Sequence, residues 1–379
     1  MSNARRVLFV GHDASRTGAP ILLLHFLRWF KVNTDIPFDI LLREGGELRS
    51  DFEEVGPVTV LGPWPSRWDL AGLLRRRWLL ARLAAASHGL VYSNTVTNGH
   101  VVQSLARGSR PVVSHIHELE SIIRSFGTKN FDLVSQHTRA YVACSNAVRD
   151  NLVEKHRIDP GAIEVVHEFI QIPSVTAEGA SRSRARVFRE LGIPAGALVV
   201  GASGTRDWRK SPDLFIQLAQ AVRRRCLQLP VYFVWVGGSA ASAAHWDELH
   251  YDIRGVGMED QIRFVESRPN AIDVFCAFDV FALVSREDPY PLVCLEAASL
   301  GKPIVCFDGS GGARELVEHD AGFVVPYLDI ETMAARTSEL LGSEQLRRSQ
   351  GVRAASKVRA RHAVSVAAPK ILKIIERYS

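Results

Sequence analysis

The chain has 379 residues, of which 46% are hydrophobic and 23% charged, values typical of a globular protein large enough for two domains. No apolar run approaches the ~18–20 residues of a membrane-spanning helix, and Val7–Val10, which follows Arg5 and Arg6, is too short for a signal peptide. The net charge of +5 suits anionic substrates or an anionic membrane surface, but it is too small to indicate a nucleic-acid-binding protein. We therefore expect a cytoplasmic protein with no nucleic-acid partner.

The cysteines are odd in number, far apart and without CxxC spacing. They are Cys144, Cys226, Cys276, Cys294 and Cys306. This pattern is typical of small buried side chains in a reducing compartment. We expect no zinc site.

Segments with strand and helix patterns alternate through the first half of the chain. The expected strands cover residues 6–10, 38–42, 58–61, 89–93, 111–115, 140–145 and 163–166. The expected helices cover residues 19–31, 47–54, 69–87 and 146–156, the last with Asn146 as its cap. Such alternation predicts a parallel sheet that is covered on both faces.

Residues 176–186 are small, polar and charged, and we interpret them as the connection to a second α/β half. Its expected strands cover residues 198–202, 231–236, 262–265, 280–284, 302–307 and 323–325. Its expected helices cover residues 212–225, 245–254, 271–277, 292–300, 313–319, 330–341 and 344–375.

The alternation predicts two domains of the α/β class. We expect an N-terminal domain over residues 1–175, a C-terminal domain over residues 176–359, and a helix at about 360–379 that packs back on the first domain. Two doubly wound domains that face one another leave a cleft between the carboxyl edges of their sheets, where such sheets bind ligands.

Two carboxylates flank the start of a predicted helix in the second half. Pro289 and Pro291 bracket Tyr290 in a turn, and Pro291 suits the first helical position because the N–H that it lacks would be unpaired there. Asp288 would lie in the loop and Glu296 about a turn and a half into the helix, whose N-terminus attracts anions. A site for a phosphate and several hydroxyls and a plain turn with two solvated acids both fit this spacing.

A loop between Gly11 and Gly18 follows the first strand and precedes a helix, so its amides could face a phosphate. It matches neither the dinucleotide fingerprint nor the P-loop. Gly18 is the residue that would allow close approach of the backbone. The alternative is an ordinary turn between a strand and a helix.

His115 and His117 lie on the same side of a strand end. The pair could suggest a metal site, but no third ligand lies nearby, so we expect no metal. A histidine at this edge could instead donate a hydrogen bond to a sugar hydroxyl or a phosphate. The alternative is a structural histidine with satisfied hydrogen bonds.

Basic residues form two further groups. Arg209 and Lys210, with Arg206 nearby, precede a helix and could neutralise a diphosphate, although a solvated charge cluster is the commoner case for such a run taken alone. The stretch from Arg75 to Leu83 combines arginines, Trp78 and leucines, so it could contact an anionic membrane. The simpler interpretation is an amphipathic helix with its tryptophan packed inside.

Together these segments resemble the retaining family 4 glycosyltransferases of GT-B fold, over nearly the whole chain. The most specific match is Asp288-x7-Glu296, which fills the frame of the family's Glu-x7-Glu motif. Further matches are Ala297-Ala298, Gly301-Lys302-Pro303, Gly309–Gly312 with Glu315, Lys210 before Pro212-Asp213-Leu214, His117-Glu118, and Thr17-Gly18-Ala19.

The resemblance implies two Rossmann-like domains and transfer of a hexose or deoxyhexose, with retention, from a nucleotide diphosphate sugar. The implied acceptor is a glycan or lipid-linked glycan of cell-surface polysaccharide biosynthesis, at the inner face of the membrane. No cofactor and no metal would be needed, because cations and helix dipoles would stabilise the leaving diphosphate.

The resemblance also assigns roles to residues. The implied catalytic residues are His117, which would contact the sugar, and Asp288. The implied nucleotide-binding residues are Glu296 on the ribose and, near the diphosphate, Lys210, Arg209, Gly18, Leu292 and Val293. The implied contacts to the donor sugar are Asp288, Pro289 and Tyr290.

Three departures from the family pattern affect these roles. The first motif acid is Asp288 rather than Glu, and Pro291 replaces the usual glycine, which removes one amide donor. The usual arginine before the motif lysine is absent; Arg209 or Arg206 could replace it, and we prefer Arg209 because it is adjacent to Lys210. A non-catalytic nucleotide-sugar-binding protein, a sugar-nucleotide epimerase and a phosphorylase therefore stay open as alternatives.

Overall fold

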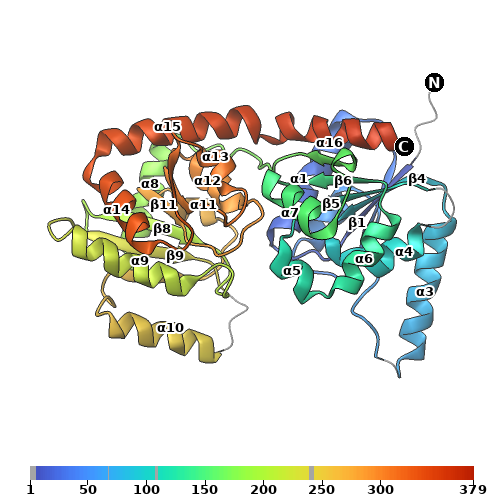
Figure 1. Cartoon of the computed structure of the whole chain (residues 1–379), viewed down its shortest axis with the longest axis horizontal. Helices are drawn as coiled ribbons and strands as arrows, with labels where there is room; N and C mark the ends of the chain where they lie inside the picture. Colours follow the sequence, from blue (N-terminus) through green and yellow to red (C-terminus); the bar gives the residue numbers. More distant parts are fainter. Residues whose placement is uncertain (1–5, 67, 107–109, 239–242) are drawn as a thin grey trace. The chain divides into compact units, whose positions relative to one another are not determined.

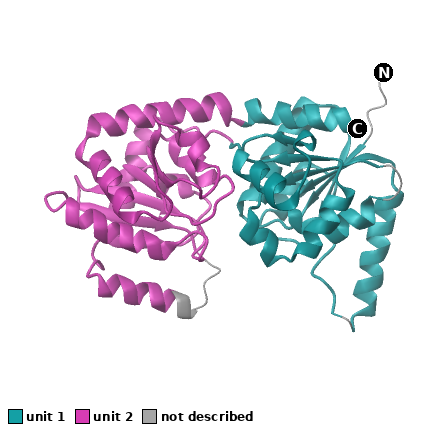
Figure 2. Cartoon of the chain, in the orientation of Figure 1, with its two compact units in different colours: residues 1–170, 364–379 teal, residues 171–363 magenta. Residues whose placement is uncertain are grey.

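The computed structural model describes residues 6–66, 68–106, 110–238 and 243–379. It divides into two units, shown in Figure 2: unit 1 comprises residues 1–170 and 364–379, and unit 2 comprises residues 171–363. The divisions after residues 170 and 363 compare with the expected boundaries after residues 175 and 359.

Unit 1 contains a parallel sheet in the order β3-β2-β1-β4-β5-β6-β7 (Figure 1). Its strands are β1 Arg6–Gly11, β2 Phe38–Leu42, β3 Val58–Val60, β4 His88–Asn94, β5 Val112–Ile116, β6 Ala140–Ala143 and β7 Ile163–Val165. Its α-helices are α1 Gly18–Asn33, α2 Arg49–Val55, α3 Leu70–Ala85, α4 Gly99–Leu105, α5 Glu120–Ser125, α6 Thr128–His137, α7 Asn146–His156 and α16 Val364–Tyr378, with short 3-10 turns at η1 Val96–Asn98 and η2 Pro160–Ala162.

The alternation of side chains along β1 builds a core on each face of this sheet. Leu8 and Val10 point to one face, where they join a buried cluster against which α3 packs. Phe9 points to the other face and meets Phe26 and Phe30 of α1 edge-on, with ring centroids 5.9 and 5.4 Å away. The strand order reverses between β1 and β4, the position at which such sheets bind ligands.

Unit 2 contains a second parallel sheet in the order β10-β9-β8-β11-β12-β13. Its strands are β8 Leu198–Ser203, β9 Val231–Val236, β10 Ile262–Val265, β11 Val280–Leu283, β12 Ile304–Phe307 and β13 Gly322–Val325. Its helices are α8 Ala177–Leu191, α9 Pro212–Arg225, α10 Ala243–Gly255, α11 Ala271–Phe275, α12 Leu292–Ser299, α13 Ala313–Val317, α14 Ile330–Gly342 and α15 Glu344–Arg361.

The second sheet is held by aromatic side chains from strands and helices. Trp235 of β9 is buried and packs edge-on against Phe215 of α9, with ring centroids 5.6 Å apart. Gly201 of β8 is required by packing, because a Cβ atom there would lie 2.1 Å from the ring of Phe278. The order of this sheet reverses between β8 and β11.

Several expectations were wrong in detail. Residues 176–186 are not a connection, since they form most of α8, which Thr176 caps by accepting from the N–H of Gly179. The cap of α7 is Ser145 rather than Asn146. The single helix expected over residues 344–375 is two, α15 and α16, and they belong to different units.

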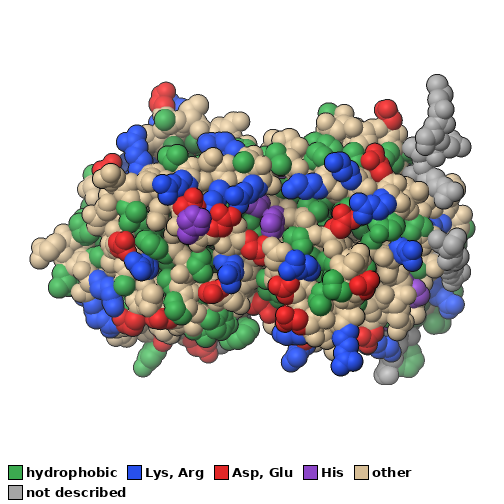
Figure 3. Space-filling model, turned by 45° about the horizontal axis from the view of Figure 1, so that its top comes forward, with side chains coloured by type: hydrophobic (Ala, Val, Ile, Leu, Met, Phe, Trp, Pro, Cys, Tyr) green, Lys and Arg blue, Asp and Glu red, His purple; other side chains and the backbone are tan. Residues whose placement is uncertain are grey.

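The distribution of surface charge and the composition of the helices help to define the class of protein. Positive and negative side chains are interspersed over the face in Figure 3, so the small net charge is not the sum of two large opposed patches there. Among the described helices, none combines the length and apolar composition needed to cross a bilayer. Among the described residues, no two of the five cysteines are joined in a disulfide.

Candidate functional site

Two loops meet at the point where the order of the unit 2 sheet reverses. One runs from β8 to α9 and the other from β11 to α12. The backbone N–H of Arg286 donates to the carbonyl oxygen of Arg209 at 2.8 Å, and its guanidinium binds both carboxylate oxygens of Asp213 at 3.0 and 2.7 Å. These contacts fix the second loop against the first.

An ion pair joins the two loops at their centre. The Nζ atom of Lys210 lies 2.5 Å from Oδ2 of Asp288, and the Ser285 hydroxyl donates to the same oxygen at 3.3 Å. The backbone N–H of Lys210 donates to Asp207 at 2.9 Å, which fixes the position of the lysine. Gly204 and Thr205 are the two residues five or six positions before the lysine, where the family pattern would place an arginine. A Cβ atom at position 204 would lie 3.0 Å from the lysine stem. The glycine therefore leaves room for Lys210.

A glycine loop after β12 supports Asp288 from a third side. The N–H of Asp288 donates to the carbonyl oxygen of Ser310 at 2.7 Å, and Asp288 forms a parallel bridge with Gly311. The N–H of Gly312 donates to the carbonyl oxygen of Pro289 at 3.0 Å. The main chain around the acid is thus held in place, which is what a binding site requires of its supporting residues.

Helix α12 begins beside this ion pair. Pro291 is its cap rather than its first residue, so the helix starts at Leu292. The N–H groups of Leu292 and Val293 lie in the first turn of α12. N–H groups in the first turn have no hydrogen-bond acceptor within the helix, so these two are available to an anion. The N–H of Cys294 bonds to the carbonyl oxygen of Pro291 at 3.0 Å.

Glu296 lies in the middle of α12 and is half-buried. Burial raises the pKa of its carboxyl group to about 7. Within the described ranges, no hydrogen-bond donor or cation pairs with this carboxylate. A desolvated acid without a partner is suited to accept hydrogen bonds from ligand hydroxyl groups.

The structure places the two candidate arginines differently. Arg209 donates to the carbonyl oxygen of Glu287 at 3.3 Å, so it touches the loop that carries Asp288. Arg206 is buried, binds Glu266 at 2.8 Å and lies 4.2 Å over the ring of Trp246. Of the two, Arg209 is the one that contacts the loop of the motif acid.

The side chain of Tyr290 does not extend from this loop as a sugar contact would require. It is buried, and its hydroxyl lies 3.2 Å from Nε2 of His362, just after α15. Pro289 is buried as well. Any contact of these two residues with a donor sugar would therefore come from main-chain atoms.

In unit 1 the loop between Gly11 and Gly18 is held by its own side chains and by a neighbouring loop. Asp13 accepts hydrogen bonds from the backbone N–H and the hydroxyl of Ser15 at 2.9 and 2.8 Å. Gly46 allows the neighbouring loop to approach, because a Cβ atom there would lie 2.4 Å from the carbonyl group of Ala14. Gly18 itself is exposed and is the first residue of α1.

His117 is fixed through both of its ring nitrogens. Its Nδ1 lies 2.6 Å from Glu168 and its Nε2 lies 2.9 Å from Oδ1 of Asn94. The amide nitrogen of Asn94 donates to the carbonyl oxygen of Ala19 at 3.0 Å, so its oxygen is the atom that faces the histidine. Both ring nitrogens are therefore donors, as in an imidazolium ion.

The electrostatic surroundings of His117 agree with this assignment. Burial lowers its pKa, but the charge and hydrogen bond of Glu168 and the charge of Glu118 together raise the pKa above its ordinary value. His115 is buried, its Nδ1 lies 2.8 Å from the hydroxyl of Tyr92, and burial together with His117 holds its pKa well below the usual range. His115 is therefore neutral.

Among the described residues, one group has ligand atoms close enough to hold a metal ion: His117, Cys144 and Glu168. The pair of His115 and His117, considered from the sequence, does not form this group, because only His117 belongs to it. Both nitrogens of His117 donate hydrogen bonds, so neither offers a lone pair to a metal in this arrangement.

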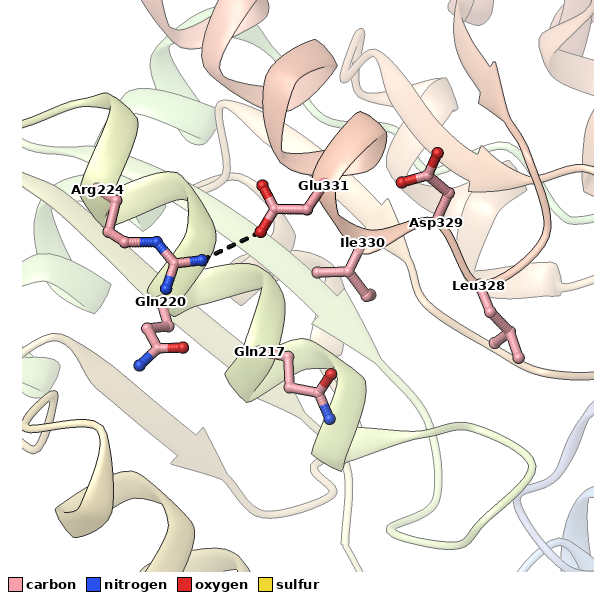
Figure 4. Close-up of a pocket in the computed structure, with 7 residues that line it drawn as sticks. All are labelled: Gln217, Gln220, Arg224, Leu328, Asp329, Ile330 and Glu331. Atoms are coloured by element: carbon pink, nitrogen blue, oxygen red, sulfur yellow. Dashed lines mark hydrogen bonds and ion pairs between the residues drawn. The ribbon is translucent and has the colours of Figure 1, made fainter.

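A cavity of about 400 Å³ lies elsewhere in unit 2, between α9 and the start of α14 (Figure 4). Gln217, Gln220 and Arg224 line one side of it, and Leu328 to Glu331 line the other. Arg224 bonds to Glu331 at 3.1 Å across it. No residue of the motif loops lines this cavity, so it is separate from the candidate site.

Two functional candidates escaped sequence reasoning, Asn94 and Glu168. Asn94 ends β4 and Glu168 follows β7, and each reaches His117 from a different strand. Their position after the carboxyl ends of parallel strands was the available signal.

Comparison with known proteins identifies the family. The model of "Glycosyl transferases group 1" matches residues 183–357, and the model of "Glycosyltransferase Family 4" matches residues 35–172. The D-inositol 3-phosphate glycosyltransferase of Mycobacteroides abscessus is 28% identical over 316 residues, which are 81% of this chain and 64% of that protein. The enzyme of the same name from Salinispora arenicola is 27% identical over 75% of this chain and 67% of its own. The chain thus spans about two thirds of the length of these relatives.

Solved structures show the same fold at low sequence identity. HepE of Anabaena, crystallised with UDP and glucose, has a TM-score of 0.84 at 21% identity and covers 98% of this chain and 99% of its own. Sucrose-phosphate synthase of Thermosynechococcus elongatus has a TM-score of 0.77 at 14% identity, with 98% and 99% covered. With both halves matched by family models and two parallel-sheet, Rossmann-like domains of the α/β class, the chain belongs to the family 4 glycosyltransferases of GT-B fold.

Proposed function

We propose that this protein transfers a hexose or deoxyhexose from a nucleotide diphosphate sugar to a glycan or lipid-linked glycan, with retention and without a metal ion. The observation that carries this proposal is the meeting of three features at one sheet edge. These are the Lys210–Asp288 pair, the open start of α12, and the unpartnered carboxylate of Glu296.

Each feature suits one part of the donor. The hydroxyl groups of a ribose would donate to Glu296. The diphosphate would accept hydrogen bonds from the amides of Leu292 and Val293 and from Lys210, which keeps further N–H donors beside its bond to Asp288. Asp288 and the main chain of Pro289 and Tyr290 would contact the sugar, and Arg209 would add positive charge near the diphosphate.

These groups also account for departure of the diphosphate without a metal. As the bond from the anomeric carbon to the diphosphate oxygen breaks, negative charge grows on that oxygen. Lys210 and the dipole of α12 stabilise this charge. The acceptor oxygen then bonds to the anomeric carbon on the same face, and its proton passes to the leaving diphosphate. His117, with both nitrogens engaged, would act as a fixed positive charge and not as a base.

The comparisons suggest which ligands to test first. HepE, the neighbour in fold, was crystallised with UDP-glucose, so that sugar nucleotide is the first donor to test. The curated relatives are named for D-inositol 3-phosphate, which makes it a soluble acceptor to test beside lipid-linked glycans. From the family resemblance of the sequence, we also propose that the acceptor belongs to cell-surface polysaccharide biosynthesis at the cytoplasmic face of the membrane.

The test is turnover of sugar nucleotides by the purified protein, in buffer with and without a chelator. We expect slow release of free sugar from the preferred donor, faster transfer when an acceptor is present, an unchanged anomeric configuration by NMR, and no effect of the chelator. Tight binding without turnover for any acceptor would indicate a non-catalytic binding protein. Conversion of the donor into an isomeric sugar nucleotide would indicate an epimerase.

A further inference from the structure

Helix α3 and the loop before it expose an unusual group of apolar side chains. Trp64, Trp68, Leu70, Leu74 and Trp78, which we call the α3 surface, are each between 60% and 80% exposed. Leu70, Leu74 and Trp78 follow one another at intervals of four residues and so share one side of the helix. The expectation that Trp78 packs inside is wrong.

The α3 surface is not the side by which this helix attaches to its unit. Leu79, Leu80 and Leu83 are partly buried and pack against the core cluster that contains Leu8 and Val10. The helix therefore has one apolar side that is used in folding and a second that is not. An apolar group of this size on a folded unit is a mark of an interaction site.

The loop that carries Trp64 is attached to the helix. Arg76 is buried, donates to the carbonyl oxygen of Gly62 at 3.1 Å, and lies 4.5 Å from the centre of the Trp64 ring. Trp64 is thus held beside α3 before any partner arrives. Preorganisation of this kind lowers the entropic cost of binding.

The charges within residues 68–85, which carry most of the α3 surface, are almost all positive. Residues 68–85 contain four arginines and a single acid, Asp69, whose side chain accepts from the N–H of Gly72 as the cap of the helix. Arg75, Arg77 and Arg82 are exposed, and Arg82 lies 5.7 Å from the centre of the Trp78 ring. A partner that meets this surface should offer an apolar layer next to a layer of negative charge.

We propose that the α3 surface docks onto an anionic phospholipid bilayer. Tryptophan favours the depth of the lipid headgroups, leucine favours the acyl chains below, and arginine pairs with lipid phosphates. A glycan partner fits less well, because Leu70 and Leu74 offer nothing to sugar hydroxyls and Asp69, the one acid of residues 68–85, is engaged as a cap. This proposal concerns unit 1 alone and does not depend on the nucleotide-sugar site.

The experiment is co-sedimentation of the full chain with vesicles of equal parts phosphatidylglycerol and phosphatidylcholine, at low and high salt. We expect binding to these vesicles at low salt, weaker binding at high salt, and little binding to pure phosphatidylcholine. Acyl chains that carry bromine should quench tryptophan fluorescence, which reports insertion and not mere electrostatic attraction.

Two double variants test separately the apolar side chains and the arginines of α3. Leu74→Ser with Trp78→Ser should lower the partition coefficient about tenfold or more, and Arg75→Gln with Arg77→Gln should do the same. The matched controls are Leu227→Ser with Val352→Ser and Arg348→Gln with Arg359→Gln, exposed positions in unit 2 that should leave binding unchanged.

All altered side chains are exposed, so a change in binding should reflect the surface and not unfolding of the variant. Circular dichroism checks that each variant is folded. Absence of wild-type binding at low salt, or binding by both α3 double variants that is as strong as that of the wild type, would overturn the proposal. Concentration-dependent self-association that these variants abolish, in the absence of vesicle binding, would instead identify the surface as a contact between copies of this chain.

Discussion

The Nζ atom of Lys210 lies 2.5 Å from Oδ2 of Asp288, although 78 positions separate the two residues in the chain. Their side chains are 14% and 5% exposed, so the pair is largely removed from water. The acid of the family motif is one methylene shorter here, and its contact with the lysine is nevertheless direct. A donor diphosphate would therefore meet a lysine that is already held in position.

Removal of Lys210 should affect both folding and binding. Lys210→Met leaves Asp288 buried without its cation, so we expect a loss of roughly 3–5 kcal/mol in the free energy of unfolding, measured by urea denaturation. Affinity for a nucleotide diphosphate sugar should fall in the same variant. Lys155→Met, at an exposed position of α7, is the control. A loss below about 1 kcal/mol would show that the pair is effectively solvated.

Glu296 should make donor binding depend on pH. Its pKa is raised to about 7, and hydroxyl donors from a ribose would favour the ionised form, so binding should release a proton. We expect affinity for the sugar nucleotide to be constant above pH 7 and to fall by up to tenfold for each pH unit below it. Isothermal titration calorimetry in buffers of different ionisation enthalpy measures the proton directly.

Glu296→Gln separates this effect from other titrations. The variant should bind the sugar nucleotide with little dependence on pH between 5 and 8, a range of about three units around the raised pKa. The raised pKa also means that Glu296 binds a proton in the folded state more readily than in the unfolded state. Stability should therefore fall as pH rises from 4.5 to about 7, and the variant should lose that slope.

His117 should stabilise unit 1 through its charge. Its folded pKa is raised above 6.5, so its contribution is complete below pH 6.5 and is lost as pH rises through the folded pKa. His117→Gln should lower the free energy of unfolding by about 2 kcal/mol in mildly acidic buffer and by less in alkaline buffer. His319→Gln, at an exposed position, should show no such difference. An effect independent of pH would contradict the doubly protonated ring.

Lys357 fastens α15 to the rest of unit 2. Its Nζ lies 2.8 Å from Glu318, contacts Asp320, and donates to the carbonyl oxygens of Leu316 and Val317 at 3.1 and 3.2 Å. Hydrogen bonds from Lys357 and Arg361 lower the pKa of Glu318 to about 2.

Because that pKa is lowered, the stabilisation is present above pH 4.5 and is lost as pH falls towards 2. Lys357→Met should cost roughly 1–2 kcal/mol at neutral pH, because the two acids are partly exposed, and should flatten the acid limb of the stability profile, measured by chemical denaturation. Lys373→Met, an exposed lysine of α16, is the control and should leave both unchanged.

Much of the fold could be predicted from local patterns. The expected bounds of α9 and β9 are those of the structure. Helix α9 has a long apolar pattern of helical period that begins at Pro212 and ends at three arginines, residues 223–225. Strand β9 is an apolar run that follows Pro230. The helix over 177–191 was missed because it is rich in small and charged residues and buries few apolar side chains, namely Val187 and Phe188.

The sequence indicates which residues are candidates for the site, but it does not indicate which of them are in contact. The motif frame indicates Lys210, Asp288 and Glu296, yet nothing in a linear spacing shows that the first two bond or that Glu296 lacks a partner. The partners of His117 come from β4 and from the chain after β7, which only the sheet order brings together. Tyr290 lies inside the motif, but its hydroxyl contacts His362, a residue far along the chain.

We propose that the carboxyl edge of the unit 2 sheet binds a nucleotide diphosphate sugar. The most direct measurement is the thermal shift of the wild type and of Glu296→Ala with UDP, GDP, ADP and dTDP sugars, since a ligand bound only by the native state raises its apparent stability. We expect a thermal shift of the wild type with one class of donor and its loss in Glu296→Ala. An unchanged shift in the variant would contradict the site, and no shift with any donor would contradict the function.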